Sequence, residues 1–299
     1  MFLVTCSPPR VPSIDGLRGV LALYVMTMHF LGMISVRTPL PNPHLAVMIF
    51  FLMSGYVLTP IWDGDYLSFL ARRFLRLWPV YAFCLATGAL LLGVAVSWSD
   101  FLWYPLTANA TVSTIDFPMW SLLVEAWMML AMPLIAWSGK SLPRLAFGIT
   151  CFVALSHFVP LAMNGTLFIL GGYCAKWRFN FAPLNTRVPQ WLGKVSYSLY
   201  LTHWLVFKVC CSYLTGTAYF AAFPTAMLIG YLVWSTIERR SVRLSREFAQ
   251  FVKQRKAIYG DRYRGQRVRP SACEAAGRPF PIPGADERPP LLGRVASPR

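Results

Sequence analysis

The amino-acid sequence predicts an all-α protein, a polytopic bundle of about eight transmembrane helices with both termini in the cytoplasm. Of its 299 residues, 56% are hydrophobic and only 13% are charged. Its mean hydropathy of +0.48 is too high for a soluble domain. Apolar stretches long enough to cross a hydrocarbon core of about 30 Å recur along the chain. Basic residues are also concentrated in alternate connections between these stretches, as the positive-inside rule describes.

The candidate spans are read from apolar runs. They fall near residues 15–35, 45–62, 77–98, 119–138, 144–162, 164–177, 188–210 and 216–237. We expect the first span to be retained, because no small-residue cleavage pattern follows it. The weakest span is 164–177, which is short and contains Gly165, Gly171 and Gly172. Such a segment is tilted, re-entrant or closely packed on a neighbour.

The basic residues orient these spans. If the first span enters from the cytoplasm, only Arg37 and Lys208 of the membrane region lie outside. Residues 239–299 then lie inside, with 15 Lys or Arg against 5 Asp or Glu. Beside a membrane, a basic tail of this kind is expected to face anionic lipid headgroups, so we expect no nucleic acid partner.

Composition also divides the chain into two regions. We expect residues 11–240 to form the membrane domain and residues 241–299 to form a basic, Pro/Arg-rich cytoplasmic tail that is largely disordered. The 7 cysteines are scattered and form no Cys-x-x-Cys pair. The sequence therefore predicts neither a disulfide framework nor a metal site.

The first span carries two ionisable residues within an apolar helix. His29 follows Arg18 by eleven positions, which is three helical turns, or about 16 Å, along one face. Ionisable groups inside a membrane usually face a bundle interior or a wet cavity, so a functional role is expected. In the structural alternative, Arg18 extends to the lipid headgroups and His29 is a hydrogen-bonded core residue.

A second cluster of arginines precedes the third span. In FLARRFLRLWPVY, Arg73 and Arg76 lie three positions apart on one helix face. Their forked guanidinium groups suit phosphate binding. The alternative is that the cluster serves only to orient the span.

Two further spans contain buried polar groups. Glu125, in WSLLVEAWMMLAMP, lies inside an apolar helix and needs a partner, for which a histidine is one candidate. The span LGKVSYSLYLTHWLV combines several hydroxyl groups with an imidazole. We interpret Ser196, Tyr197 and His203 as lining a substrate path, although hydrogen bonds between helices alone would account for several of these side chains.

Together, these segments resemble the integral-membrane acyltransferase-3 family, which includes bacterial O-acetyltransferases acting on polysaccharides and other glycans. The resemblance covers roughly residues 11–240. Its motifs, in chain order, are IDGLRG with His29, FFLMSGYVL, RRFLRLWP, WSLLVE, FILGGY, LGKVSYSLYLTH and Glu238-Arg239-Arg240. Family members commonly have ten spans, two more than we expect here.

The resemblance implies an enzyme that moves an acyl group, expected to be acetyl, from acyl-CoA to a hydroxyl group. The acceptor would be a glycan or another molecule of the cell envelope or secreted by the cell. By the same resemblance, His29 and Glu125 are catalytic, and Arg18, Arg73 and Arg76 bind the coenzyme A phosphates. Acetyl-CoA would be a donor substrate, with no permanently bound cofactor. We expect the chain in the bilayer of a bacterial inner membrane.

The chemistry of the residues agrees with these roles. A neutral imidazole suits the removal of a hydroxyl proton at neutral pH. Coenzyme A is polyanionic, so its phosphates are expected at the cytoplasmic mouth near the arginines. Two alternatives remain: a transporter that uses His29, Glu125 and Arg18 as a proton or substrate relay, and a shortened family member that has lost its activity. Transporters often contain internal repeats, and none is visible here.

Overall fold

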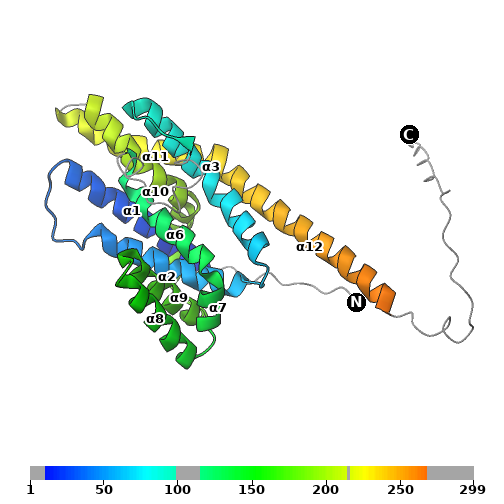
Figure 1. Ribbon diagram of the computed structural model, residues 1–299. Helices are drawn as coiled ribbons and strands as arrows, with labels where there is room; N and C mark the ends of the chain where they lie inside the picture. The colour runs from blue at the N-terminus through cyan, green and yellow to red at the C-terminus, as the bar shows by residue number, and fades with distance from the viewer. Residues whose placement is uncertain (1–10, 99–114, 214–215, 268–299) are drawn as a thin grey trace, which may run out of the picture. The chain divides into compact units, whose positions relative to one another are not determined.

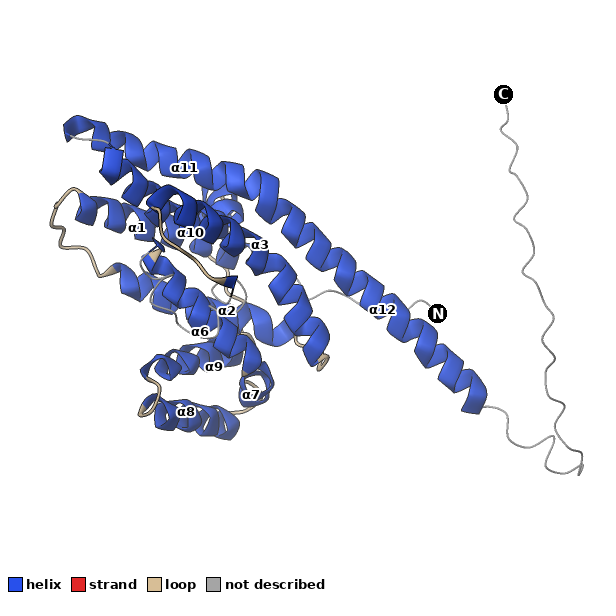
Figure 2. Cartoon of the chain, turned by 45° about the horizontal axis from the view of Figure 1, so that its top comes forward, coloured by secondary structure: helices blue, strands red, loops and turns tan. Residues whose placement is uncertain are grey.

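The computed structural model describes residues 11–98, 115–213 and 216–267. These residues form helices joined by loops and turns, with no strand among them (Figure 2). By contacts the chain divides into two units, Met1–Gln250 and Phe251–Arg299. The all-α class is therefore confirmed for the described residues.

Three long helices open the first unit. They are α1 (Pro12–Met33), α2 (Pro43–Ile61) and α3 (Tyr66–Leu92) (Figure 1). Proline stands in the first turn of α1 and α2, where its missing N–H costs no hydrogen bond. Asp65 caps α3 by accepting a hydrogen bond from the backbone N–H of Ser68, and Gly93 ends α3 in the left-handed conformation.

The fourth predicted span, 119–138, is bent into two helices. The segment consists of a 3₁₀ turn (η1, Phe117–Met119), α6 (Trp120–Leu130) and α7 (Met132–Ser138). The axes of α6 and α7 meet at 71°. The break at Ala131 lies two residues before Pro133, whose ring clashes with the carbonyl group four residues earlier and whose missing N–H removes one helical hydrogen bond. The predicted span 119–138 is therefore helical, but it consists of two helices joined at a sharp bend.

The next helices are shorter. They are α8 (Leu142–Ser156), a 3₁₀ turn η2 (Pro160–Met163) and α9 (Asn164–Cys174). Helix α9 packs parallel to α2, because Phe168 lies against Gly55 and, one turn later in both helices, Gly172 lies against Thr59. A Cβ atom on Gly171 would overlap the carbonyl oxygen of Leu52. The close-packing alternative for the weakest predicted span therefore fits α9.

The last helices complete the first unit and enter the second. They are η3 (Ala182–Asn185), α10 (Arg187–Tyr213), η4 (Gly216–Ala221), α11 (Ala222–Val233), a π-helical turn η5 (Trp234–Glu238) and α12 (Arg239–Arg267). Helix α12 occupies a region expected to be a largely disordered tail. The remainder of that tail, 268–299, lies outside the described residues.

Four described helical stretches are long and apolar enough to cross a membrane, or five if the bent α6–α7 pair counts as one span. They are α1, α2, α3 and the continuous stretch Gly216–Lys256. Helix α8 is apolar but has only 15 residues. Helix α10 has 27 residues but is not in this apolar set, since polar side chains interrupt its centre. All eight predicted segments are helical, but eight membrane crossings are not established.

Helices α1 and α10 form a parallel pair at the centre of the bundle (Figure 1). Gly19 lies against Gly193, and His29 lies against His203. A Cβ on Gly19 would overlap the backbone nitrogen of Gly193, and a Cβ on Gly193 would overlap the carbonyl oxygen of Asp15. Glycine at both positions therefore allows the two backbones to touch, as small residues do between membrane helices.

Candidate active site

The α1–α10 pair brings two histidines together. His29 lies ten residues after Gly19, and His203 lies ten residues after Gly193. Because the helices run parallel from this glycine contact, the two imidazoles arrive side by side. Nδ1 of His29 is 2.9 Å from Nε2 of His203. The rings are stacked, with centroids 5.2 Å apart and 7° between their planes.

His203 is the more enclosed of the two. It is fully buried, and its Nδ1 lies 3.1 Å from the carbonyl oxygen of Leu199, one turn earlier in α10. The Phe207 ring is nearly perpendicular to the His203 ring, with 5.8 Å between their centroids. Trp204 packs edge-on against His29 at 5.1 Å. Aromatic side chains therefore fix the orientation of both imidazoles.

A cavity of about 140 Å³ lies between α1, α2, α3, α6 and α10. Its charged lining consists of Arg18 from α1, Arg73 and Arg76 from α3, and Glu125 from α6. These four residues come from three helices that are distant in sequence. The structure thus gathers the three arginines and the glutamate that the sequence singled out around one space.

The cavity carries an excess of positive charge. Three guanidinium groups line it against one carboxylate. Arg18 is paired with Asp15 at 3.4 Å, and the Arg73 guanidinium lies 5.7 Å from the centre of the Phe69 ring. Among the described residues, no ion pair joins Glu125 to any of the three arginines. Because the guanidinium groups outnumber the carboxylate, the cavity favours an anionic ligand.

The rest of the lining has two chemical faces. Hydroxyl groups come from α2, α6 and α10, while the remaining α2 face is apolar. The hydroxyl-bearing residues are Ser54, Ser121, Ser196, Tyr197 and Tyr200, and the apolar ones on α2 are Val47, Phe50, Phe51, Met53, Val57 and Leu58. A space of this kind accepts a ligand with both polar and hydrocarbon parts.

Tyr200 connects the cavity with the histidine pair. It lines the cavity, and its ring centroid lies 5.9 Å from that of His203. Its hydroxyl group lies 3.0 Å from the Ser121 hydroxyl group, which donates to the carbonyl oxygen of Pro118 at 3.0 Å. The cavity and the histidine pair are therefore neighbouring parts of one region, and Tyr200 lies next to both.

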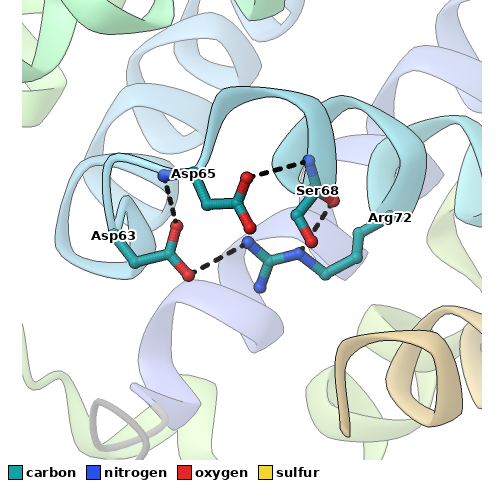
Figure 3. A network of polar contacts seen from close by, with 4 residues as sticks. All are labelled: Asp63, Asp65, Ser68 and Arg72. Atoms are coloured by element: carbon teal, nitrogen blue, oxygen red, sulfur yellow. Dashed lines mark hydrogen bonds and ion pairs between the residues drawn. The ribbon is translucent and has the colours of Figure 1, made fainter. Parts of the chain in front are cut away.

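Arg72, the third arginine of its cluster, has a different role. Its Nε donates to the carbonyl oxygen of Ser68 at 3.1 Å, and its Nη2 lies 3.5 Å from Oδ2 of Asp63 (Figure 3). Asp65 accepts a hydrogen bond from the N–H of Ser68 in the same network. Arg72 therefore ties the loop before α3 to its first turns and does not line the cavity.

The predicted site residues thus form two groups. Ser196 and Tyr197 line the cavity with the arginines, and the Tyr197 hydroxyl group donates to the carbonyl oxygen of Leu77 at 2.8 Å. His203 lies with His29 instead. A histidine was the candidate partner of Glu125, but the structure places Glu125 among arginines and pairs His29 with His203.

Sequence reasoning assigned no role to Ser121. It included Tyr200 only among the polar residues of its span, and Glu238 only in the closing motif of the family resemblance. Glu238 is buried, and its Oε2 accepts hydrogen bonds from Ser198, from the N–H at 3.1 Å and from the hydroxyl group at 2.5 Å. The π-helical turn Trp234–Glu238 places this carboxylate against α10. In the sequence, the only signal for the contact between Glu238 and Ser198 is a glutamate directly before two arginines.

Comparison with known proteins identifies a family over most of this region. The acyltransferase-3 family model, described as "Acyltransferase domain", matches residues 11–187. The curated "Protein 2 in picA locus" of Rhizobium radiobacter is 40% identical over 91 residues, which are 27% of this chain and 45% of that protein. The match therefore spans less than half of the length of this relative. No solved structure matches the chain.

Proposed function

This chain belongs to the integral-membrane acyltransferase-3 family, and from that premise we propose that it is a membrane O-acyltransferase. In this proposal, it transfers an acyl group, in the first instance acetyl, from acyl-CoA to a hydroxyl group. The acceptor is a glycan or another molecule of the cell envelope or secreted by the cell. The membrane that holds it is the bacterial inner membrane.

One observation carries this proposal: Arg18, Arg73 and Arg76 converge on a single cavity. Coenzyme A carries several phosphate charges, and guanidinium groups bind phosphate with two parallel hydrogen bonds. A cavity of about 140 Å³ is far smaller than a pocket for a drug-sized ligand. The nucleotide end of the donor therefore stays at the mouth, and only the pantetheine arm enters.

His29 supplies the base in this mechanism. It lies eleven residues beyond Arg18 on α1, about 16 Å along the helix, a distance suited to an extended pantetheine arm. The imidazole takes the proton of the acceptor hydroxyl group while the oxygen attacks the thioester carbonyl carbon. The carbon–sulfur bond then breaks, and the coenzyme A thiolate leaves and recovers the proton from His29.

In this proposal, Glu125 is not the partner of His29. It shares the cavity with the arginines, where a carboxylate orients guanidinium groups and limits their mutual repulsion. We therefore assign Glu125 to the donor end of the reaction. Ser196 and Tyr197, on the same cavity wall, lie along the path of the donor arm.

We also propose eight membrane crossings with both termini in the cytoplasm. In this topology, α1 and α10 both cross outward, and α2 and α9 both cross inward. The parallel packing of each pair supports this arrangement. A parallel α1 and α10 require an odd number of crossings between them, and the return through α11 then makes the total even. An even total returns the basic C-terminal region to the side where the chain began.

The direct test uses the purified chain in lipid nanodiscs with acetyl-CoA radiolabelled in the acetyl group. We expect loss of the thioester, with label appearing as acetate or as a base-labile ester on an added glycan. The transporter alternative predicts that the thioester stays intact and that solute or proton movement occurs in sealed vesicles instead. Comparing ester groups on surface glycans of cells with and without the gene would identify the acceptor class.

A further inference from the structure

The His29–His203 contact also constrains which ring nitrogens carry hydrogens. Two ring nitrogens at 2.9 Å share a hydrogen bond only if one carries a hydrogen and the other a lone pair. The positions of the hydrogens therefore depend on what each ring contacts through its other nitrogen. That question can be answered for His203.

The second nitrogen of His203, Nδ1, faces a backbone carbonyl group. It lies 3.1 Å from the oxygen of Leu199, and a carbonyl oxygen only accepts hydrogen bonds. Nδ1 of His203 therefore carries the hydrogen. In a neutral imidazole, the other nitrogen, Nε2, then has a free lone pair.

Burial keeps His203 neutral. The residue is 0% exposed, and among the described residues no carboxylate is paired with either imidazole. A buried imidazolium without a counter-charge is costly. Nε2 of His203 therefore accepts, and the hydrogen between the two rings belongs to Nδ1 of His29.

The same argument assigns the protonation of Nε2, the second ring nitrogen of His29. Because Nδ1 carries the hydrogen, Nε2 of the neutral ring has the lone pair. No described residue is hydrogen-bonded to that Nε2. The chain of contacts thus runs from the Leu199 carbonyl through His203 to His29 and ends in an unprotonated nitrogen.

We propose that His203 is a positioning residue that holds His29 in the tautomer with a free Nε2, so that this nitrogen is the base that accepts the acceptor's proton. This inference rests on the proposed function. The orienting group here is a second histidine whose own tautomer is set by a helix carbonyl. When Nε2 of His29 takes the proton, the Nδ1–H···Nε2 bond to His203 becomes charge-assisted and stabilises the imidazolium.

The first test measures the tautomer directly, by ¹⁵N NMR of the chain labelled at histidine. The chain has 4 histidines, and single substitutions of His44 and His157 assign the other two signals. We expect His29 to carry its hydrogen on Nδ1, with Nε2 unprotonated. A hydrogen on Nε2 of neutral His29 would overturn the inference, even in a fully active enzyme.

The second test compares two substitutions of His203. Leu fills similar space but accepts no hydrogen bond, whereas Gln carries a carbonyl oxygen at about the reach of Nε2. In His203→Leu, we expect His29 to lose its single tautomer. We expect kcat to fall on the order of tenfold to a hundredfold, which is less than the loss expected when the base itself is removed. KM for acetyl-CoA should not change. His203→Gln should restore the Nδ1–H signal and most of kcat.

The two tests separate failure of this inference from failure of the proposed function. Equal kcat values for His203→Leu and the wild type would overturn the positioning role. If the wild type showed the expected tautomer but consumed no acyl-CoA, the proposed function would be wrong. The positioning role would then be wrong as well, and only the tautomer assignment would stand. If His203→Leu failed to fold, the NMR spectrum of the wild type would still decide that assignment.

Discussion

Gly19 of α1 and Gly193 of α10 lie so close that neither position has room for a Cβ atom. This contact sets the register of the two helices. Ten residues further along each helix, the same register places His29 beside His203. A packing contact between two residues without side chains therefore determines the geometry of the proposed base.

The glycine contact leads to the first prediction. Gly193→Ala should lower the free energy of unfolding by about 1–3 kcal/mol, because the new methyl group overlaps the carbonyl oxygen of Asp15 and must displace a helix. The matched control is Gly32→Ala in α1, since nothing lies within 4 Å of a Cβ at Gly32. Alanine there should leave stability unchanged or raise it by up to about 1 kcal/mol.

Thermal unfolding in the same detergent would measure both variants. Acyl transfer should fall in Gly193→Ala and stay at the wild-type level in Gly32→Ala. If the two variants had equal melting temperatures, the close approach of α1 and α10 at this level would be refuted.

The second prediction concerns the arginines. Arg76→Ala should mainly raise KM for acetyl-CoA, because a phosphate contact far from the thioester affects binding more than chemistry. A charge-assisted hydrogen bond contributes about 1.5–3 kcal/mol, which corresponds to a KM increase of roughly tenfold to a hundredfold. Arg76→Lys should recover only part of this loss, because lysine keeps the charge but lacks the fork.

Arg72→Ala provides the matched control for this experiment. Arg72 lies in the same cluster, but it binds Ser68 and Asp63 and does not line the cavity. Its removal should leave KM for acetyl-CoA near the wild-type value. Equal KM values for correctly inserted Arg72→Ala, Arg76→Ala and wild-type protein would remove Arg76 from the donor site and favour a role in topology alone.

The third prediction concerns membrane topology. Reporter fusions should place residue 299 and the segment 63–70 in the cytoplasm and the segment 100–116 outside. The arginines in the first three turns of α3 and the basic residues after α11 favour this orientation. A C-terminal reporter that is active only outside the cytoplasm would refute an even number of crossings.

The sequence was most informative about elements with a one-dimensional pattern. Apolar runs predicted α1, α2 and α3, and arginines at i and i+3 predicted one shared helix face. The bend between α6 and α7 was not predicted, because the apolar character continues through Pro133 without a change. The expected spans ended at residue 237 and did not include α12, because the charged composition of α12 is that of a solvated segment.

The site was predictable residue by residue but not as an arrangement. Arg18 and Glu125 were identified as ionisable groups within apolar helices, and Arg73 and Arg76 as a pair on one helix face. The structure places all four around one cavity. The pairing of His29 with His203 depends on a register between helices 174 residues apart. No periodicity within either helix encodes that register, so only three-dimensional packing reveals it.

The central claim is that the arginines bind the acyl-CoA donor while His29 performs the proton transfer. His29→Ala tests this division. The lost group is a base whose removal typically costs about 10²–10⁴-fold in rate, whereas the arginine cavity does not include His29. His157→Ala serves as the control, because His157 is exposed at the end of α8.

The measurement is the rate of coenzyme A release from acetyl-CoA by the His29→Ala protein in nanodiscs, made together with its equilibrium Kd for coenzyme A. We expect release to fall by about 10²-fold or more while the Kd and the melting temperature match those of the wild type and His157→Ala. If the folded His29→Ala protein released coenzyme A at the wild-type rate, the account of His29 as the base would be contradicted.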